Sequence, residues 1–390
     1  MTKEHREWLL EALQSGHRAY AQEALSYSVS MQDIDLRDTA PALAYPAPQA
    51  AETPSCSAVA AKYLAELSHV GAHAAKTEAE KQDALALMSD VCEDKPVAQM
   101  TKADAQRVKA VLLRLPKNRN KAARTRGKSL AEMLEVEGVQ VISARTANAY
   151  ISAMQTFFKW AVDNGYAAEN VFTGTQFKAV KKSKDGERAA FSTEQLQTIF
   201  RHLTENPDGY VNKDEHKWGT LIGMFTGMRL NEVAQLEVGD IQEVDGVWCI
   251  DVTEDGDDNK RLKNASSHRR VPIHDRLLDC GLLDFVDQQR DAGFARLFPG
   301  LSYSAQNGYG RNIGRWFNEK LLPSLDMKKP GLVFHSLRHT MVTRLGQSDA
   351  TDIKVKAIVG HAQSGVTWNT YFKEGFLPGQ LRETINQFGF

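Results

Sequence analysis

The chain has 390 residues, of which 42% are hydrophobic and 25% are charged, and its formal net charge is −1. This length indicates two or three domains with sizeable cores, and the near-neutral charge counts against a simple nucleic-acid-binding domain, which is usually clearly basic. No apolar run approaches the roughly 20 residues that span a bilayer, and the charged N-terminus lacks the apolar stretch of a signal peptide. The four cysteines are far apart and form neither a metal motif nor a disulfide framework. We therefore expect a cytoplasmic protein without a membrane partner, a metal or another cofactor.

The charge is unevenly distributed along the chain. Residues 1–55 are rich in acidic side chains, whereas 102–128 is strongly basic and shorter basic runs lie within 178–184 and 260–270. Such blocks neutralise phosphates locally even in a neutral chain, although a basic block is as often a solvated face. If these blocks bind DNA, the candidate contacts are Lys117, Arg119, Lys121, Arg124, Arg126, Lys128, Lys181 and Lys182.

The first half of the chain has the apolar periodicity of helices. Residues 1–55 predict one or two helices followed by a Pro/Ala-rich extended part. Residues 56–172 predict an all-helical domain, and the charged stretch 173–189 predicts a basic interdomain linker. The strongest element is an amphipathic helix over 143–162. Its apolar face consists of Ala147, Ile151, Met154, Phe157, Phe158 and Ala161.

From residue 190 to residue 390 the sequence predicts a further domain with a different composition. A turn enters a helix over 226–236, and 247–252 and 270–273 alternate as two strands that pair across a long loop. Helices follow to the end of the chain. The predicted fold class is therefore mostly α with a small β-sheet, an α+β domain preceded by a helical one.

Two arginines each stand three residues from a second ionisable side chain. Arg229 follows a Thr-Gly-Met run at an expected helix start, and Glu232, one turn on, is placed to hold its guanidinium. His335 and Arg338 share the face of another helix start, where the field favours an anion. Taken singly, each pair is explained at least as well by a structural role.

The remaining candidates are a lysine, a histidine and a tyrosine. Lys263 lies in the long loop between the predicted strands, with Lys260 as a rival, and His361 precedes Tyr371 by ten residues. Each alone is better explained as an exposed or structural side chain. As a set with the arginines, they suit phosphoryl transfer, because cations stabilise the negative equatorial oxygens of the transition state. Tyrosine suits a phosphate nucleophile, since it forms a covalent ester that is later reversed.

The ordered motifs resemble the tyrosine recombinase (phage integrase) family. These motifs are Thr-Gly-Met-Arg229, Lys263, His335-Ser-Leu-Arg338-His, Val-Gly-His361 and Tyr371. The resemblance is close over 190–390, which corresponds to the family's catalytic domain, and 56–172 resembles its core-binding domain.

The resemblance implies a role for each matching residue. Arg229 and Arg338 would clamp the scissile phosphate, and His361 would hydrogen-bond a non-bridging oxygen. His335 would assist as a base or an oxygen ligand, and Lys263 would protonate the leaving 5′-hydroxyl. The tyrosine would attack and form a 3′-phosphotyrosyl link, which conserves bond energy so that neither ATP nor a metal is needed.

Two features depart from the family or stay open. In many members the tyrosine lies nine residues after the histidine, and here the extra residue falls within 363–365. After Tyr371, an apolar stripe of Leu381, Ile385 and Phe388 fits either packing on its own domain or docking onto a neighbouring protomer.

The function that this resemblance implies is site-specific recombination of a phage or mobile element. The implied partners are double-stranded DNA attachment sites, a homotetramer on DNA that is a monomer when free, and a DNA-bending protein or an excisionase, all at the bacterial nucleoid. A chromosome- or plasmid-dimer resolvase is an alternative, as is a DNA-binding regulator with a vestigial site. The role of residues 1–55 stays open, because their acidic character differs from the usually basic arm-binding domains.

Overall fold

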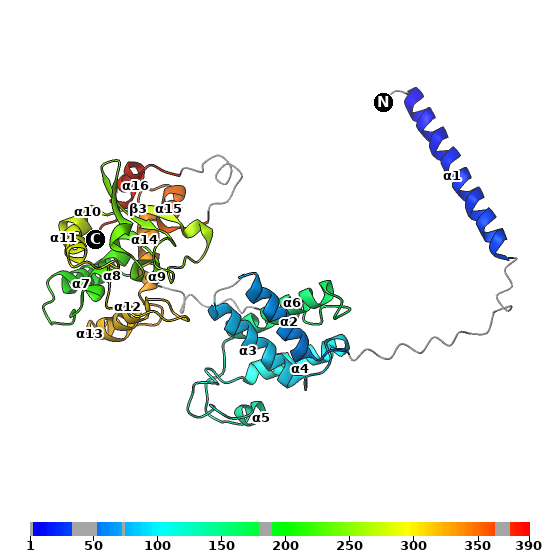
Figure 1. Ribbon diagram of the computed structural model, residues 1–390, viewed down its shortest axis with the longest axis horizontal. Coiled ribbons are helices and arrows are strands. Elements are labelled where there is room, and N and C mark those ends of the chain that lie inside the picture. Colours follow the sequence, from blue (N-terminus) through cyan, green and yellow to red (C-terminus); the bar gives the residue numbers. More distant parts are fainter. Residues whose placement is uncertain (1–2, 33–52, 72–74, 179–188, 363–374) are drawn as a thin grey trace. The chain divides into compact units, whose positions relative to one another are not determined.

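The computed structural model describes residues 3–32, 53–71, 75–178, 189–362 and 375–390. The chain divides into two compact units, 1–54 and 55–390 (Figure 1). In the first unit, α1 (Lys3–Gln32) is a single helix, and its Leu13 is 66% exposed. Within the described part of the chain, no helix is both long and apolar enough to cross a membrane.

The buried apolar side chains of the second unit form two separate clusters, one within 56–172 and the other within 191–388. The elements that form the first cluster are α2 (Cys56–His69), α3 (Ala75–Val91), η1 (Val97–Gln99), α4 (Lys102–Arg114), α5 (Leu130–Leu134) and α6 (Ala144–Asp163). The helix predicted over 143–162 is confirmed as α6, and all six residues of its predicted apolar face are buried. Phe157, at the centre of that face, packs edge-on against Tyr63 of α2.

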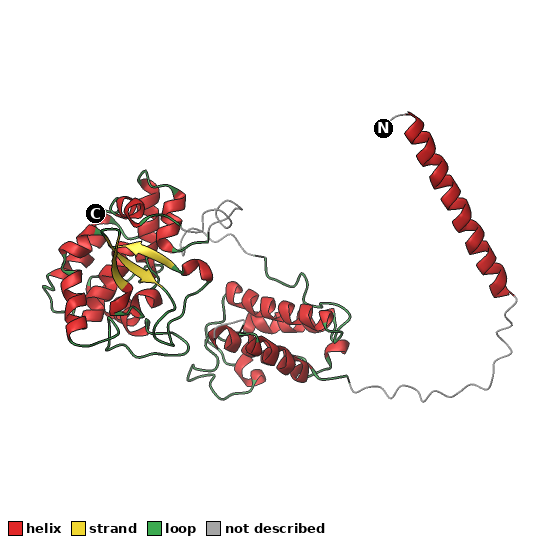
Figure 2. Ribbon diagram, turned by 45° about the horizontal axis from the view of Figure 1, so that its top comes forward, coloured by secondary structure: helices red, strands yellow, loops and turns green. Residues whose placement is uncertain are grey.

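The second cluster is enclosed by helices that surround a small sheet (Figure 2). The helices before the sheet are α7 (Thr193–Thr204), α8 (Asp214–Thr226), α9 (Leu230–Ala234) and the short η2 (Val238–Asp240). Those after it are α10 (Asp275–Asp279), α11 (Leu282–Asp291), α12 (Arg311–Trp316), η4 (Phe317–Leu321), α13 (Leu322–Ser324), α14 (His335–Gln347), α15 (Asp352–Val359) and α16 (Pro378–Ile385).

The sheet has one strand more than the sequence predicts. Its antiparallel order is β1 (Ile241–Val244), β2 (Val247–Val252) and β3 (Arg269–Pro272), with η3 (Ala265–Ser267) just before β3. The predicted pairing of the last two strands is confirmed, with Ile250 opposite Val271. Asp245 and Gly246 join β1 to β2, and both have positive φ, as a two-residue hairpin turn requires. The Asp-Gly pair is thus the sequence signal for β1.

The C-terminal stripe lies in the core of its own domain. Leu381 is 5% exposed, and Ile385 and Phe388 are at most 1% exposed. The Phe388 carbonyl lies 2.8 Å from Nε2 of His274, which follows β3. Of the two possibilities that the sequence leaves open, the structure shows packing within the chain, where these apolar side chains are covered by their own domain.

Candidate active site

Arg229 enters the site at a sharp junction between two helices. Helix α8 ends at Gly227, which has a φ of +62°, and a Cβ there would lie 3.2 Å from the Met341 side chain. Glycine therefore allows both the turn and the close approach of α14. The carboxylate of Glu232 then accepts the Arg229 backbone N–H at 2.9 Å and its Nη1 at 2.5 Å. The structure thus brings together the two residues whose spacing predicted a pair.

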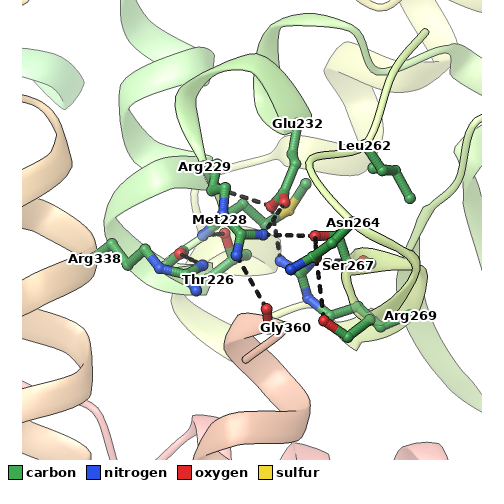
Figure 3. A network of polar contacts seen from close by, with 12 residues as sticks. Thr226, Met228, Arg229, Glu232, Leu262, Asn264, Ser267, Arg269, Arg338 and Gly360 are labelled. Atoms are coloured by element: carbon green, nitrogen blue, oxygen red, sulfur yellow. Dashed lines mark hydrogen bonds and ion pairs between the residues drawn. The ribbon is translucent and has the colours of Figure 1, made fainter. Parts of the chain in front are cut away.

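The Arg229 guanidinium joins three distant segments of the chain (Figure 3). Besides Glu232, it donates from Nη1 to Ser267 Oγ at 2.9 Å and from Nη2 to the Gly360 carbonyl at 3.1 Å. The Arg229 side chain is 20% exposed. It is therefore fixed in direction while one part stays open to solvent.

Arg338 is buried and only partly satisfied. It is 4% exposed, and its Nη1 donates to the Gly227 carbonyl at 2.8 Å. Its Nη2 has no hydrogen-bond partner among the described residues. Burial lowers the pKa of Arg338 to about 10, and the charges of Arg229 and Arg269 add to this effect. A guanidinium in this state favours a bound anion, because an anion supplies both the missing acceptor and the opposing charge.

His361 lies beside the arginines at the end of α15. That helix ends at Gly360, with a φ of +67°, and the His361 backbone N–H donates to the Lys356 carbonyl at 3.0 Å. Burial lowers the pKa of His361, as do the charges of Arg338 and Arg229. The imidazole is therefore neutral at pH 7, with one nitrogen that donates and one that accepts.

The two candidate lysines occupy opposite environments. Lys260 is 1% exposed, and its Nζ lies 2.9 Å from both carboxylate oxygens of Asp240 and 3.4 Å from Glu237. Lys263 is exposed. Its neighbour Asn264 accepts a hydrogen bond from Ser267 at 2.6 Å, and Ser267 in turn accepts from Arg229. These contacts favour Lys263, because its loop reaches the arginines while Lys260 is held elsewhere.

The beginning of α14 carries the remaining histidine candidate, His335, and a second histidine. His335 is half-buried and begins the helix, one turn before Arg338. His339 follows Arg338 in the same helix. It is exposed, and its Nδ1 lies 3.3 Å from Thr343 Oγ1 on the same helix.

Some predicted residues are not described, and others lie in the helical part of the chain. Tyr371, Lys181 and Lys182 lie outside the described residues. In the helical part, Arg119 is a poor candidate for a DNA contact, because it forms a 2.6 Å ion pair with Asp83 and is 12% exposed. The exposed members of that basic loop are Lys117, Lys121, Arg124, Arg126 and Lys128.

The sequence prediction misses Arg269, which appears there only within a basic block. Arg269 and Arg270 begin β3, and successive side chains of a strand point to opposite faces. Arg269 is therefore on the inner side with Val271, where its side chain is 7% exposed. It donates to Glu232 at 2.9 Å. Strand alternation is the signal that distinguishes it from its exposed neighbour.

Over the ranges that the structure describes, no group of three or more His, Cys, Asp and Glu side chains is arranged to hold a metal ion.

Comparisons with known proteins find matches over the part of the chain that contains this site. The model of the phage integrase family matches residues 190–376. A XerC-like tyrosine recombinase of Caldanaerobacter subterraneus subsp. tengcongensis is 26% identical over 257 residues, which cover 59% of this chain and 62% of that protein. This chain thus spans less than two thirds of that relative's length.

Two solved structures share the fold. The Tn1549 transposon integrase in complex with circular intermediate DNA has a TM-score of 0.55 and 17% identity, over 82% of this chain and 95% of that one. A lambda integrase tetramer bound to a Holliday junction has a TM-score of 0.52 and 13% identity, over 91% and 90%. The predicted class, mostly α with a small sheet, is therefore confirmed. Residues 190–376 belong to the phage integrase family of tyrosine recombinases.

Proposed function

We propose that this protein is a site-specific recombinase that cuts and rejoins DNA through a 3′-phosphotyrosyl intermediate, and that it integrates or excises a phage or other mobile element. The observation that carries the proposal is the pair of neighbouring guanidinium groups of Arg229 and Arg338 (Figure 3), with the buried Nη2 of Arg338 lacking a partner among the described residues. The charges of both arginines also act on His361. Three donors from three segments match the non-bridging oxygens of a phosphodiester.

In this mechanism the arginines act as a preorganised clamp. Arg229 is fixed by Glu232 and Gly360, and Arg338 by Gly227, so neither must reorganise when charge develops on the phosphate. The neutral His361 donates a hydrogen bond to one non-bridging oxygen. His335, on the same helix turn as Arg338, assists as a base or as an oxygen ligand.

The proposed reaction needs no reactant other than the DNA and the protein. The Tyr371 hydroxyl oxygen attacks phosphorus and passes its proton to a base, either His335 or water, and the bond between phosphorus and the 5′-oxygen breaks. Lys263 gives that oxygen a proton, so a 5′-hydroxyl leaves and a 3′-phosphotyrosyl ester remains. The 5′-hydroxyl of a partner duplex then attacks the ester and releases the tyrosine.

The proposed partners are those that the resemblance to the family implies. The substrate is a pair of double-stranded attachment sites, and the exposed basic loop 117–128 of the helical part contacts their phosphates. Four copies act together on DNA and separate when free, and a DNA-bending protein or an excisionase directs the reaction. Such a substrate lies at the bacterial nucleoid in the cytoplasm.

Trapping of a covalent complex tests the proposal. Nicked suicide duplexes that tile the DNA on both sides of the gene are incubated with the wild-type protein and with Tyr371→Phe. We expect a covalent protein–DNA band on a denaturing gel for the wild type alone. A band that persists in Tyr371→Phe contradicts the mechanism. Binding without any band in the wild type supports a regulator with a vestigial site instead.

A recombination assay distinguishes the two enzymatic roles. An integrase joins two different sites, whereas a dimer resolvase recombines two copies of one site. Plasmids that carry each arrangement of the cleaved sequence are compared, and we expect product from the unlike pair.

A further inference from the structure

Arg269 makes contacts that no role proposed so far uses. Its Nε donates to the Ile358 carbonyl at 2.7 Å, its Nη1 to the Ser267 carbonyl at 2.8 Å, and its Nη2 to Glu232 at 2.9 Å. One buried side chain thus ties together the end of α15, the loop after Lys263 and the start of α9 (Figure 3).

Each of these three contacts ends next to a residue of the proposed mechanism. Oε1 of Glu232 accepts from the Arg229 guanidinium, and Oε2 accepts from the Arg269 guanidinium and the Arg229 backbone N–H, so the carboxylate is held from both sides. Ile358 is two residues before Gly360, whose carbonyl accepts from Arg229. The Ser267 hydroxyl also accepts from Arg229. Each described acceptor of the Arg229 side chain therefore belongs to a residue that Arg269 contacts or lies two residues from one.

The close packing around Gly360 gives an independent sign of the same arrangement. A Cβ on Gly360 would lie 2.7 Å from Nη1 of Arg269 and 3.0 Å from its Cζ. The guanidinium thus lies directly against the backbone that leads to His361. A side chain of any other length or shape would leave this position empty or push the α15 end away.

The donors of Arg269 also differ from those of Arg338. Nε, Nη1 and Nη2 of Arg269 are each engaged by protein acceptors. In Arg338, by contrast, Nη2 has no described partner. Arg269 is therefore not arranged to hold a phosphate itself.

We propose that Arg269 is a positioning residue that sets the alignment of Arg229 and His361 by fixing Glu232 and the end of α15. The inference rests on the proposed function of this site. It adds a residue that touches neither the DNA nor the reacting atoms, and its effect passes through the groups that do.

Variants of Arg269 and its neighbour test this role. Arg269→Lys keeps the charge but loses the three-way fork, and Arg269→Gln loses both. The matched control is Arg270→Gln, because Arg270 lies next in the strand but points outward and pairs with Asp251 at 2.7 Å. Both Arg269 variants are expected to lower the single-turnover rate of covalent-complex formation by roughly 100-fold at saturating DNA, with affinity for the duplex unchanged. The control keeps the wild-type rate.

Two further measurements separate positioning from general stability. In a double-mutant cycle, Glu232→Gln and Arg269→Gln together are expected to cost much less than the product of their separate effects, because both act through the Glu232 carboxylate. Hydrogen exchange in the free protein is expected to speed up at the His361 amide in both Arg269 variants but not in Arg270→Gln. This second measurement needs no activity, so it separates failure of this inference from failure of the proposed function.

Several results would overturn the inference. One is a folded Arg269→Gln variant that cleaves at the wild-type rate. Others are effects that multiply with Glu232→Gln, unchanged exchange at His361, or full activity of Arg269→Lys, since the charge alone would then suffice. A lost rate in the Arg270→Gln control would also overturn it, because the effect would not depend on the buried fork.

Discussion

The structure predicts different consequences for two lysines that lie three residues apart in one loop. Lys260 is buried against Asp240, whereas Lys263 is exposed and precedes Asn264, which contacts Arg229 through Ser267. Lys260→Met is therefore expected to damage stability, whereas Lys263→Met is expected to damage the departure of the 5′-oxygen.

The magnitude for Lys260 follows from its ion pair. The Lys260 and Asp240 side chains are 1% and 8% exposed, and removal of one partner from such a buried pair costs about 3–5 kcal/mol. In a domain of this size, that loss lowers the unfolding midpoint by roughly 6–20 °C. Burial already raises the pKa of Asp240. Protonation of this carboxyl in the variant limits the loss, so the lower end of the range is expected.

The assay compares two leaving groups. Loss of a general acid slows cleavage by roughly 10²–10⁴-fold. A duplex with sulfur in place of the bridging 5′-oxygen needs no such acid, because a thiolate leaves without protonation. Lys263→Met is expected to be slow on the oxygen duplex, fast on the sulfur duplex and unchanged in thermal midpoint. Lys260→Met is expected to cleave both duplexes normally below its lowered midpoint.

The opposite pattern would refute this reasoning. If folded Lys260→Met is slow on the oxygen duplex and recovers with sulfur, the buried lysine is the acid, and the pair with Asp240 must open during the reaction.

Three further predictions concern stability and pH. Gly360→Ala is expected to lower the free energy of unfolding by about 1–3 kcal/mol in urea titrations, because φ is +67° and the new Cβ meets Arg269; unchanged stability would contradict the described packing. Burial acts to raise the pKa of Asp104, but hydrogen bonds from Thr101 and Lys95 outweigh it and bring the pKa to about 2. The resulting stabilisation of the folded state, about 2 kcal/mol, is therefore present above the unfolded pKa near 4 and is lost as the pH falls towards 2. Asp104→Asn is expected to lower the free energy of unfolding at pH 7 but not near pH 2. An equal loss at both pH values would contradict the role of the Asp104 charge. The pKa of His361, measured by NMR, is expected below its ordinary value of about 6.5 at low salt and to rise with added salt, since neighbouring arginines help to lower it; an ordinary value at low salt would argue against the cluster.

Local patterns in the sequence predict the parts of the fold that depend on neighbouring residues. The apolar face of α6 follows from helical spacing, and the pair of Arg229 and Glu232 follows from their separation of three residues. The resemblance of the ordered motifs, rather than any one of them, brings Arg338 and His361 into the same site. Strand β1 has its signal in Asp245-Gly246, but its two central side chains are exposed, so it shows little apolar alternation.

Contacts between distant segments do not follow from such patterns. Arg269 meets Ile358 across 89 residues, and no local period marks that meeting. The choice of Lys263 over Lys260 as the general acid likewise has a physical basis only once the burial of Lys260 is known. The C-terminal stripe shows the same limit, because an apolar face in a sequence does not say which surface covers it.

The uneven charge of the arginine cluster has a thermodynamic consequence for the DNA-free protein. Arg229 and Arg269 both pair with the carboxylate of Glu232, and the positive charges of these two arginines also act on Arg338. Their mutual repulsion is relieved when a polyvalent anion enters, so anion binding and folding are linked. Phosphate or sulfate in a buffer should therefore protect the free protein against heat and, at the same concentrations, compete with the DNA backbone. The buffer anion is therefore expected to change both the thermal stability of the enzyme and its apparent affinity for DNA.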